Sequence, residues 1–275
     1  MKHLTDLSGL SRGDVNEIFR TADELARGEH PGALAGKTAV MFFPSSSLRT
    51  RISFERGVYL LGGQPVLFPP ETLDKREELR DVAGYMGGFA DIAVVRHSDK
   101  GVIRQLAENS RIPVINAMTK EDHPCEILTD MYALTKLRGD ISRLSFLFVG
   151  AAGNIGRTWK QASELMGFGL IQCCPEGYEL GGVRVCRTIK EAIKGIDIVC
   201  TDSLPGGAVE AFAPCRVTAA AMAKANKGAL LNPCPPFFRG EEVSADAIAS
   251  EHFVGYGFKD ALLNVQQAIM LYCLG

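Results

Sequence analysis

Short apolar runs alternate with amphipathic segments along almost the whole chain. In the first half, the apolar runs predict strands at residues 38–43, 65–68, 92–96 and 113–116. Apolar residues at helical spacing predict helices at 14–27, 47–61, 77–86, 101–108 and 124–137. This alternation is typical of βαβ units, in which helices cover both faces of a parallel sheet.

A second series of the same kind follows a break at Arg138-Gly139-Asp140. It predicts strands at 144–149, 170–173, 196–200 and 229–232, and helices at 154–166, 219–224 and 260–274. We therefore expect an α/β protein with two doubly wound parallel-sheet domains of similar size, joined by long helices. The expected domains are residues 1–138 with a C-terminal helix at 259–275, and residues 139–258. A cleft between the two is the expected ligand site.

Composition excludes several classes of partner. The 275 residues include 30 Lys and Arg and 32 Asp and Glu, a net charge of -2, so an anion site must be a local cluster and nucleic acid is not expected. No apolar segment approaches the roughly 20 residues that cross a bilayer, and the N-terminus lacks the apolar core of a signal peptide, so we expect a cytoplasmic protein. The eight cysteines and five histidines are scattered, which predicts that most of the thiols are reduced core residues and that no metal is bound. No cofactor is expected either.

The segment Pro44-Ser-Ser-Ser-Leu-Arg-Thr-Arg51 joins a predicted strand to a predicted helix. The first turn of a helix has unpaired N–H groups and partial positive charge, so a phosphate is its natural ligand. Hydroxyls of Ser47 and Thr50 and the guanidinium groups of Arg49 and Arg51 would add charge-assisted bonds. A serine N-cap with two solvated arginines is the alternative.

A second motif, His123-Pro-Cys-Glu-Ile-Leu-Thr-Asp130, begins the long helix after the strand at 113–116. His123 and Glu126 are three residues apart, which places them on one helix face near the carboxyl end of the sheet. A structural histidine followed by a proline at the first helical position is the alternative.

Together, S-x-R-T-R and H-P-C-E-x-L-x-D resemble motifs of the aspartate and ornithine carbamoyltransferase family. Three further segments match in order: 75–81 resembles the family's mobile loop, 91–97 its arginine-bearing strand, and 232–235 its late H-x-x-P loop. The features are mixed but closer to the ornithine branch.

The resemblance implies a site for carbamoyl phosphate. Ser47, Leu48, Arg49 and Thr50 would bind the phosphate, while Arg96 and His123 approach the carbonyl oxygen and Glu126 faces the carbamoyl amino group. Lys75 matches a lysine that, in the aspartate branch, enters the neighbouring subunit's site. The implied catalytic residues are Arg49, Thr50, Arg96 and His123, and the implied assembly is a homotrimer or a multiple of trimers.

Several positions depart from the family pattern. Leu48 replaces a hydroxyl residue, Glu126 a glutamine and Asn232 a histidine, and Pro236 stands where arginine is common. Leu262 occupies the place of an arginine that the ornithine branch commonly carries. A carboxylate at position 126 would be costly near a phosphate unless it is paired or protonated.

The amine acceptor is left open by conflicting matches. Arg157 resembles the aspartate branch, in which an arginine grips a substrate carboxylate, whereas Asn154 and Asp202 resemble the ornithine branch; Cys234 and Pro235 complete the expected acceptor site. Because Asp202 suits an ammonium group, we expect transfer to ornithine or an ornithine-like amino acid, as in arginine biosynthesis. An aspartate-type transferase stays open.

Two alternatives come from other classes. Gly150-x-x-Gly153-x-x-Gly156 follows a strand and opens a helix, and Glu176 lies 20 residues after Gly156, as in an NAD(P)-dependent dehydrogenase. The departures at Leu48, Glu126 and Asn232 are also compatible with a catalytically silent relative that only binds phosphate ligands.

Overall fold

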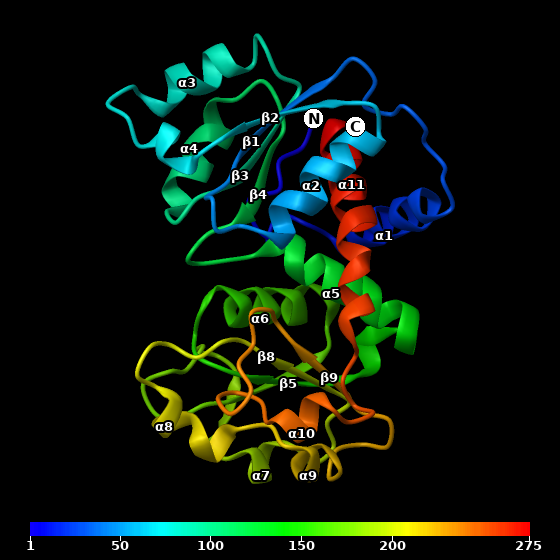
Figure 1. Cartoon of the computed structure of the whole chain (residues 1–275), viewed down its shortest axis with the longest axis vertical. Coiled ribbons are helices and arrows are strands. Elements are labelled where there is room, and N and C mark those ends of the chain that lie inside the picture. Colours follow the sequence, from blue (N-terminus) through cyan, green and yellow to red (C-terminus); the bar gives the residue numbers. More distant parts are fainter. The chain divides into compact units, whose positions relative to one another are not determined.

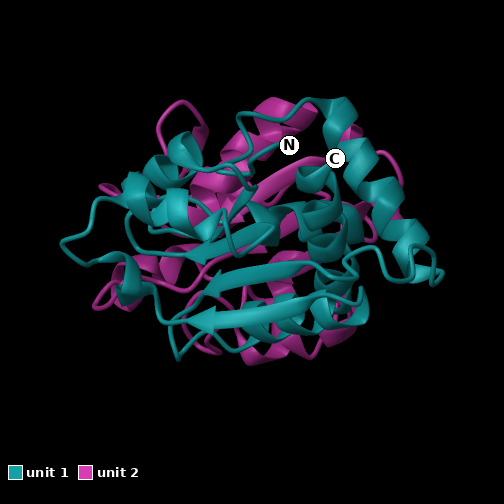
Figure 2. Ribbon diagram, turned by 90° about the horizontal axis from the view of Figure 1, so that it is seen from above, with its two compact units in different colours: residues 1–133, 259–275 teal, residues 134–258 magenta.

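The computed structural model describes residues 1–275, which divide into two compact units (Figure 2). Unit 1 contains Met1–Ala133 and Lys259–Gly275, and unit 2 contains Leu134–Phe258. The expected domain break lay after residue 138, whereas the first division falls after Ala133, inside helix α5 (Pro124–Arg138). The C-terminal segment from residue 259 belongs to unit 1.

Unit 1 is built on a parallel sheet of four strands in the order β2-β1-β3-β4 (Figure 1). Its strands are β1 (Thr38–Phe42), β2 (Gln64–Phe68), β3 (Ile92–Arg96) and β4 (Val114–Met118). Its helical elements are α1 (Arg12–Ala26), α2 (Arg49–Leu60), η1 (Pro70–Leu73), α3 (Leu79–Met86), α4 (Lys100–Asn109), the first part of α5, and α11 (Ala261–Leu274), which follows η4 (Tyr256–Asp260).

Successive side chains of the central strands point to opposite faces of this sheet, and both faces are buried. Val40 and Phe42 of β1 pack with α3 and α4 residues such as Ala83 and Leu106 in one core cluster. Ala39 and Met41 are buried on the other side. Helix α11 packs against both α1 and α2.

Unit 2 has a parallel sheet of five strands in the order β7-β6-β5-β8-β9. Its strands are β5 (Ser145–Val149), β6 (Gly169–Cys173), β7 (Arg184–Cys186), β8 (Ile198–Thr201) and β9 (Leu230–Pro233). Its other elements are η2 (Ile141–Arg143), α6 (Asn154–Met166), α7 (Ile189–Ala192), α8 (Val209–Phe212), η3 (Ala213–Cys215), α9 (Ala219–Met222) and α10 (Ala245–Ile248).

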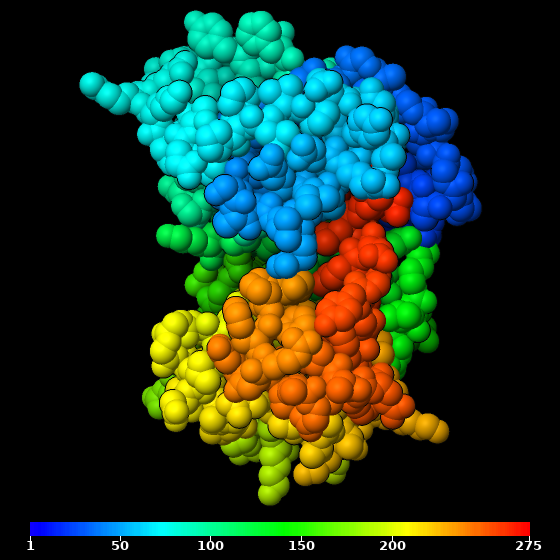
Figure 3. All heavy atoms as spheres, viewed as in Figure 1, coloured from blue at the N-terminus to red at the C-terminus, as the bar shows by residue number.

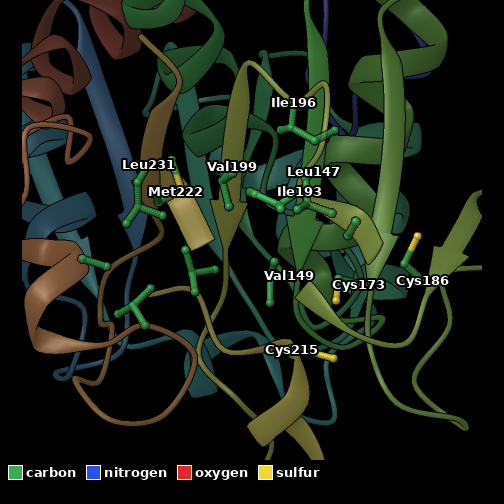
Figure 4. Packing of buried hydrophobic residues seen from close by; sticks show 14 of the residues in the cluster. Leu147, Val149, Cys173, Cys186, Ile193, Ile196, Val199, Cys215, Met222 and Leu231 are labelled. Atoms are coloured by element: carbon green, nitrogen blue, oxygen red, sulfur yellow. The ribbon is translucent and has the colours of Figure 1, made fainter. Parts of the chain in front are cut away.

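The core of unit 2 is filled by aliphatic side chains and thiols from all five strands, including Val149, Cys173 and Val199 (Figure 4). All eight cysteines of the chain are buried and free of disulfides, as expected for core thiols. The predicted fold class is confirmed: both sheets are entirely parallel and carry helices.

Each sheet reverses its strand order at one point. In unit 1 the chain passes from β1 to β2 and then to β3 on the other side of β1, so the reversal lies between β1 and β3. In unit 2 the corresponding point lies between β5 and β8. Ligands of open α/β sheets bind beyond the carboxyl ends of the strands at such points. None of the helices combines the length and apolar character needed to cross a membrane.

Candidate active site

The reversal point of unit 1 brings the two sequence motifs and Arg96 to one edge of the sheet. Ser47 follows β1, Arg96 ends β3, and His123 follows β4 immediately before α5. Nη1 of Arg96 donates a hydrogen bond to Oγ of Ser47 at 3.1 Å, across the gap between β1 and β3. Burial lowers the pKa of Arg96, with Arg49 adding to this effect and Glu126 opposing it.

The start of α2 is open to an anion. Its N-cap residue is Leu48, which makes no side-chain capping bond, and the first turn contains no acidic residue. The backbone N–H groups of residues 48–51 have no acceptor in the chain, since the first helical bond runs from Ile52 N to Leu48 O. The serine N-cap alternative is therefore wrong, because the Ser47 hydroxyl meets Arg96 instead.

The other side chains of this motif divide between the site and the surface. Thr50 is buried, whereas Leu48 and Arg49 are exposed. Arg49 lies close enough to Arg96 and Glu126 for its charge to shift the pKa of each. Arg51 instead forms an ion pair with Glu55 one turn further along, at 3.4 Å from Nε to Oε2.

His123 and Glu126 are both buried at the start of α5. Burial lowers the pKa of His123 to about 4, with Arg96 and Lys259 contributing and Glu126 opposing. At neutral pH the imidazole is therefore uncharged, and one ring nitrogen carries a hydrogen while the other can accept. The ring can thus polarise a neighbouring oxygen without adding a charge to the site.

Sequence reasoning missed Lys259. Its Nζ lies 2.6 Å from Oε1 of Glu126 and also contacts Oδ1 of Asp130. Burial alone would raise the pKa of Glu126, but Lys259, His123 and Arg49 outweigh burial and hold that pKa below its usual value. Glu126 is therefore ionised and paired. The two residues are far apart in sequence, so no local pattern could have indicated the contact.

Two depressions adjoin these residues in unit 1. One, of about 540 Å³, is lined by Arg49, Arg56 and Lys259, by the polar residues Ser53 and Asp260, and by apolar residues of α2 and α11. Figure 3 shows the light-blue atoms of α2 beside the red atoms of the C-terminal segment. The other, of about 330 Å³, is lined by Pro44, Arg96 and Asp74 among others.

Lys75 does not join the group around Arg96 within this chain. It lies exposed in the loop between η1 and α3. Its neighbour Asp74 is tied to His97, with Oδ1 of Asp74 2.9 Å from Nε2 of His97. The base of the Lys75 loop is thereby fixed beside the residue that follows Arg96.

The reversal point of unit 2 brings together the expected acceptor residues of β5 and β8. Helix α6 begins at Asn154 with Gly153 as its N-cap residue, and Asp202 follows β8. A Cβ atom at Gly153 would stand 3.5 Å from Oδ2 of Asp202, so this carboxylate lies against the helix start. Arg157 is exposed one turn along α6.

The glycine-rich turn before α6 has a packing explanation. A Cβ atom at Gly156 would stand 2.5 Å from Cε1 of Phe148, closer than any side chain permits. Only glycine lets α6 approach β5 this closely. The turn therefore does not require a dinucleotide to account for it.

Cys234 and Pro235 follow β9 at the same edge, where the Cys234 N–H donates to the Thr201 carbonyl at 3.0 Å. Glu242, which sequence reasoning also missed, is 1% exposed and accepts the Phe238 N–H at 2.8 Å. Burial raises the pKa of Glu242 to about 7, and the charges of Glu241 and Asp202 add to the rise. Asp202 and Glu242 are therefore electrostatically coupled.

Family models match both parts of the chain. The carbamoyl-P binding domain of aspartate/ornithine carbamoyltransferase matches residues 2–136, and the Asp/Orn binding domain matches residues 142–273. The chain belongs to the aspartate/ornithine carbamoyltransferase family. The resemblance that the two motifs indicated is thereby confirmed.

Full-length relatives support the same assignment to the carbamoyltransferase family. The ornithine carbamoyltransferases of Chromobacterium violaceum and Nitrosomonas europaea are 33% and 36% identical to this chain, each covering 100% of it and 97% of the relative. The crystal structure of ornithine carbamoyltransferase from Burkholderia thailandensis has a TM-score of 0.91 at 33% identity, covering 100% of this chain and 99% of the other. A dehydrogenase is not favoured by these matches.

Proposed function

We propose that this chain transfers the carbamoyl group of carbamoyl phosphate to the amine of an amino acid, with ornithine as the first candidate, and releases phosphate. The observation that carries the proposal is the start of α2, where the N–H groups of residues 48–51 lack acceptors beside Arg49 and Arg96. An uncapped helix start with two guanidinium groups favours a dianion.

Ser47, Leu48, Arg49 and Thr50 would hold the phosphate through backbone N–H groups, hydroxyls and the Arg49 guanidinium. Arg96, fixed by its bond to Ser47, would contact the carbonyl oxygen together with Thr50 and the neutral His123. Glu126 would accept a hydrogen bond from the carbamoyl amino group. Lys75 would complete the site of a neighbouring copy.

The chemistry needs no covalent intermediate on the protein. The neutral amine attacks the carbonyl carbon, a C–N bond forms, the C–O bond to phosphate breaks, and the amine releases one proton. Negative charge grows on the carbonyl oxygen and then on the leaving phosphate. Donors already aimed at these oxygens stabilise the transition state more than the substrate.

The acceptor would bind at the reversal point of unit 2. Asp202 would hold the α-ammonium group of the amino acid, while Asn154, Arg157, Cys234 and Pro235 line the rest of the site. Support for ornithine comes from this carboxylate and from the ornithine carbamoyltransferases among the relatives. An anabolic ornithine carbamoyltransferase of Campylobacter jejuni, 25% identical with a TM-score of 0.89, supports a role in arginine biosynthesis.

A transfer assay tests the proposal. Purified protein is given carbamoyl phosphate with ornithine, aspartate, lysine, putrescine or no amine, and both phosphate and the N-carbamoyl product are measured. We expect ornithine-dependent formation of both in equal amounts. Transfer to aspartate would identify the aspartate-type alternative, and binding of carbamoyl phosphate without product from any amine would identify a silent relative.

We also propose that copies of the chain associate through an apolar edge of unit 1, as a trimer or a multiple of trimers. Val66 and Phe68 of the edge strand β2, with Phe89 after α3, are exposed and line an apolar depression of about 340 Å³. Unpaired apolar edges of this kind favour association. Light scattering should give a mass that is a multiple of three 29.7 kDa chains, and a monomer would contradict this. The eight free thiols support a reducing compartment such as the cytoplasm.

A further inference from the structure

Lys259 occupies a buried position between two carboxylates of α5. Glu126 and Asp130 are 6% and 1% exposed and lie four residues apart, on one face of the helix. The Lys259 ammonium contacts one oxygen of each. Its own side chain is 15% exposed.

The Lys259 contact coincides with two departures from the family pattern, at positions 126 and 262. The family pattern places glutamine at position 126 and, in the ornithine branch, arginine at position 262, but this chain has Glu126 and Leu262. Leu262 is 6% exposed and lines the depression beside α2, so it supplies no charge there. Where the resemblance implies an arginine at 262 and a neutral amide at 126, this chain therefore has an uncharged side chain and a carboxylate. Lys259, three residues before Leu262, lies against that carboxylate.

We propose that Lys259 is a positioning residue for carbamoyl phosphate, which permits a glutamate to stand at position 126. This inference rests on the proposed function. Lys259 neutralises Glu126 and so removes the repulsion between its carboxylate and the bound phosphate. It also fixes the carboxylate through Oε1.

The remaining oxygen of Glu126 suits the substrate. Oε2 accepts no hydrogen bond in the chain, and an ionised carboxylate can only accept. The carbamoyl amino group can only donate at this point. With Lys259 bound to Oε1, Glu126 therefore offers the substrate an acceptor oxygen and carries a neutralised charge. A glutamine at this position would offer the same acceptor through its uncharged amide oxygen.

Removing the Lys259 ammonium should weaken binding of carbamoyl phosphate, and replacing Glu126 by a neutral residue should restore that binding. Without the ammonium group, Glu126 would be a buried carboxylate near a dianion, with the guanidinium groups of Arg49 and Arg96 as its remaining nearby cations. Breaking one partner from a buried pair leaves an uncompensated charge. The neutral Glu126→Gln side chain needs no such cation.

The experiment compares wild-type protein with Lys259→Met, Glu126→Gln and the double variant. Lys37→Met is the matched control: Lys37 pairs with Asp91 at 3.7 Å, at the amino ends of β1 and β3 in the same unit. The KM for carbamoyl phosphate, kcat, the inhibition constant of inorganic phosphate and the urea midpoint are measured for each.

We expect Lys259→Met to raise the KM for carbamoyl phosphate and the phosphate inhibition constant at least tenfold, with a smaller change in kcat. Glu126→Gln should raise both constants less than Lys259→Met does, and the double variant should recover most of the loss caused by Lys259→Met. The control should match wild type. If Lys259→Met does not fold, the double variant should fold and bind phosphate.

Normal binding by Lys259→Met would overturn the proposal, and so would a double variant that is weaker than Lys259→Met or that also fails to fold. These results differ from failure of the proposed function itself. In that case the wild-type protein would neither transfer the carbamoyl group nor be protected from unfolding by phosphate.

Discussion

Arg49→Ala is the sharpest test of the phosphate site. Arg49 is exposed at the first position of α2 and forms no ion pair in the chain, so its removal leaves core packing intact. Alanine is also a good helix former. The variant should therefore fold with wild-type stability while losing one positive charge at the open helix start.

The expected loss follows from the charge that Arg49 would meet. A guanidinium about 4 Å from a unit charge contributes about 1 to 4 kcal/mol, depending on how much water screens the pair. Removing one donor that stabilises a developing oxyanion costs about 3 kcal/mol, which is about a hundredfold in rate. We therefore expect kcat/KM for carbamoyl phosphate to fall at least a hundredfold.

Arg56→Ala is the matched control for this measurement. Arg56 is exposed on the same helix and lines the same depression as Arg49, so the substitution changes the net charge equally. Initial rates over a range of carbamoyl phosphate concentrations, at low and high salt, separate a local contact from general electrostatic attraction. Wild-type kcat/KM in Arg49→Ala, or an equal fall in both variants, would refute the assignment of Arg49 to the leaving group.

Three further predictions concern single side chains. Asp202→Asn should raise the KM for the amine at least tenfold more than the KM for carbamoyl phosphate, and an equal rise in both would indicate a structural role instead. The folded-state pKa of His123, about 4, lies below its unfolded value of 6.5, so this residue should destabilise the native state by about 3 kcal/mol as pH falls from 6.5 to 4. Urea unfolding at pH 7 and 4.5 should therefore show a smaller loss of unfolding free energy on acidification for His123→Gln than for wild type. The effect of Glu242 on stability has the opposite pH dependence, because its folded-state pKa of about 7 exceeds the unfolded value of 4.5. Glu242 should therefore destabilise the native state by about 3 kcal/mol as pH rises from 4.5 to 7, and Glu242→Gln should be more stable than wild type at pH 8 but not at pH 4.5.

Hydrophobic patterning predicted the long elements because they repeat the same spacing over many residues. Helix α6 begins and ends where expected, and the other strands and helices predicted along the chain differ from the observed ones by only a few residues at their ends. The predicted helix at 47–61 begins two residues later, since Ser47 and Leu48 form the turn that leaves the first N–H groups open. Strand β7 and the short helices α7, α8 and α10 were missed, because three or four residues do not establish a period.

The candidate site was predictable only where its residues are close in sequence. The motifs beginning at Pro44 and His123 each lie at the end of a strand, and parallel strands bring such ends to one edge. The Lys259–Glu126 contact joins the C-terminal segment to α5, and the Asp202–Glu242 coupling joins two loops of unit 2. Only the folded chain brings these pairs together: Lys259 lowers the pKa of Glu126, whereas Asp202 adds to the rise that burial causes in the pKa of Glu242.

The discontinuity of unit 1 has a consequence for biosynthesis. Unit 2 is one continuous stretch, so its core needs no residue that follows Phe258. Unit 1 must wait for its last helix, because α11 covers α1 and α2 and Cys273 receives the Lys2 amide hydrogen at 2.9 Å. A chain translated only as far as residue 258 would therefore leave uncovered the faces of α1 and α2 that α11 contacts, and it would lack the Lys259 ammonium that pairs with Glu126 in the anion site.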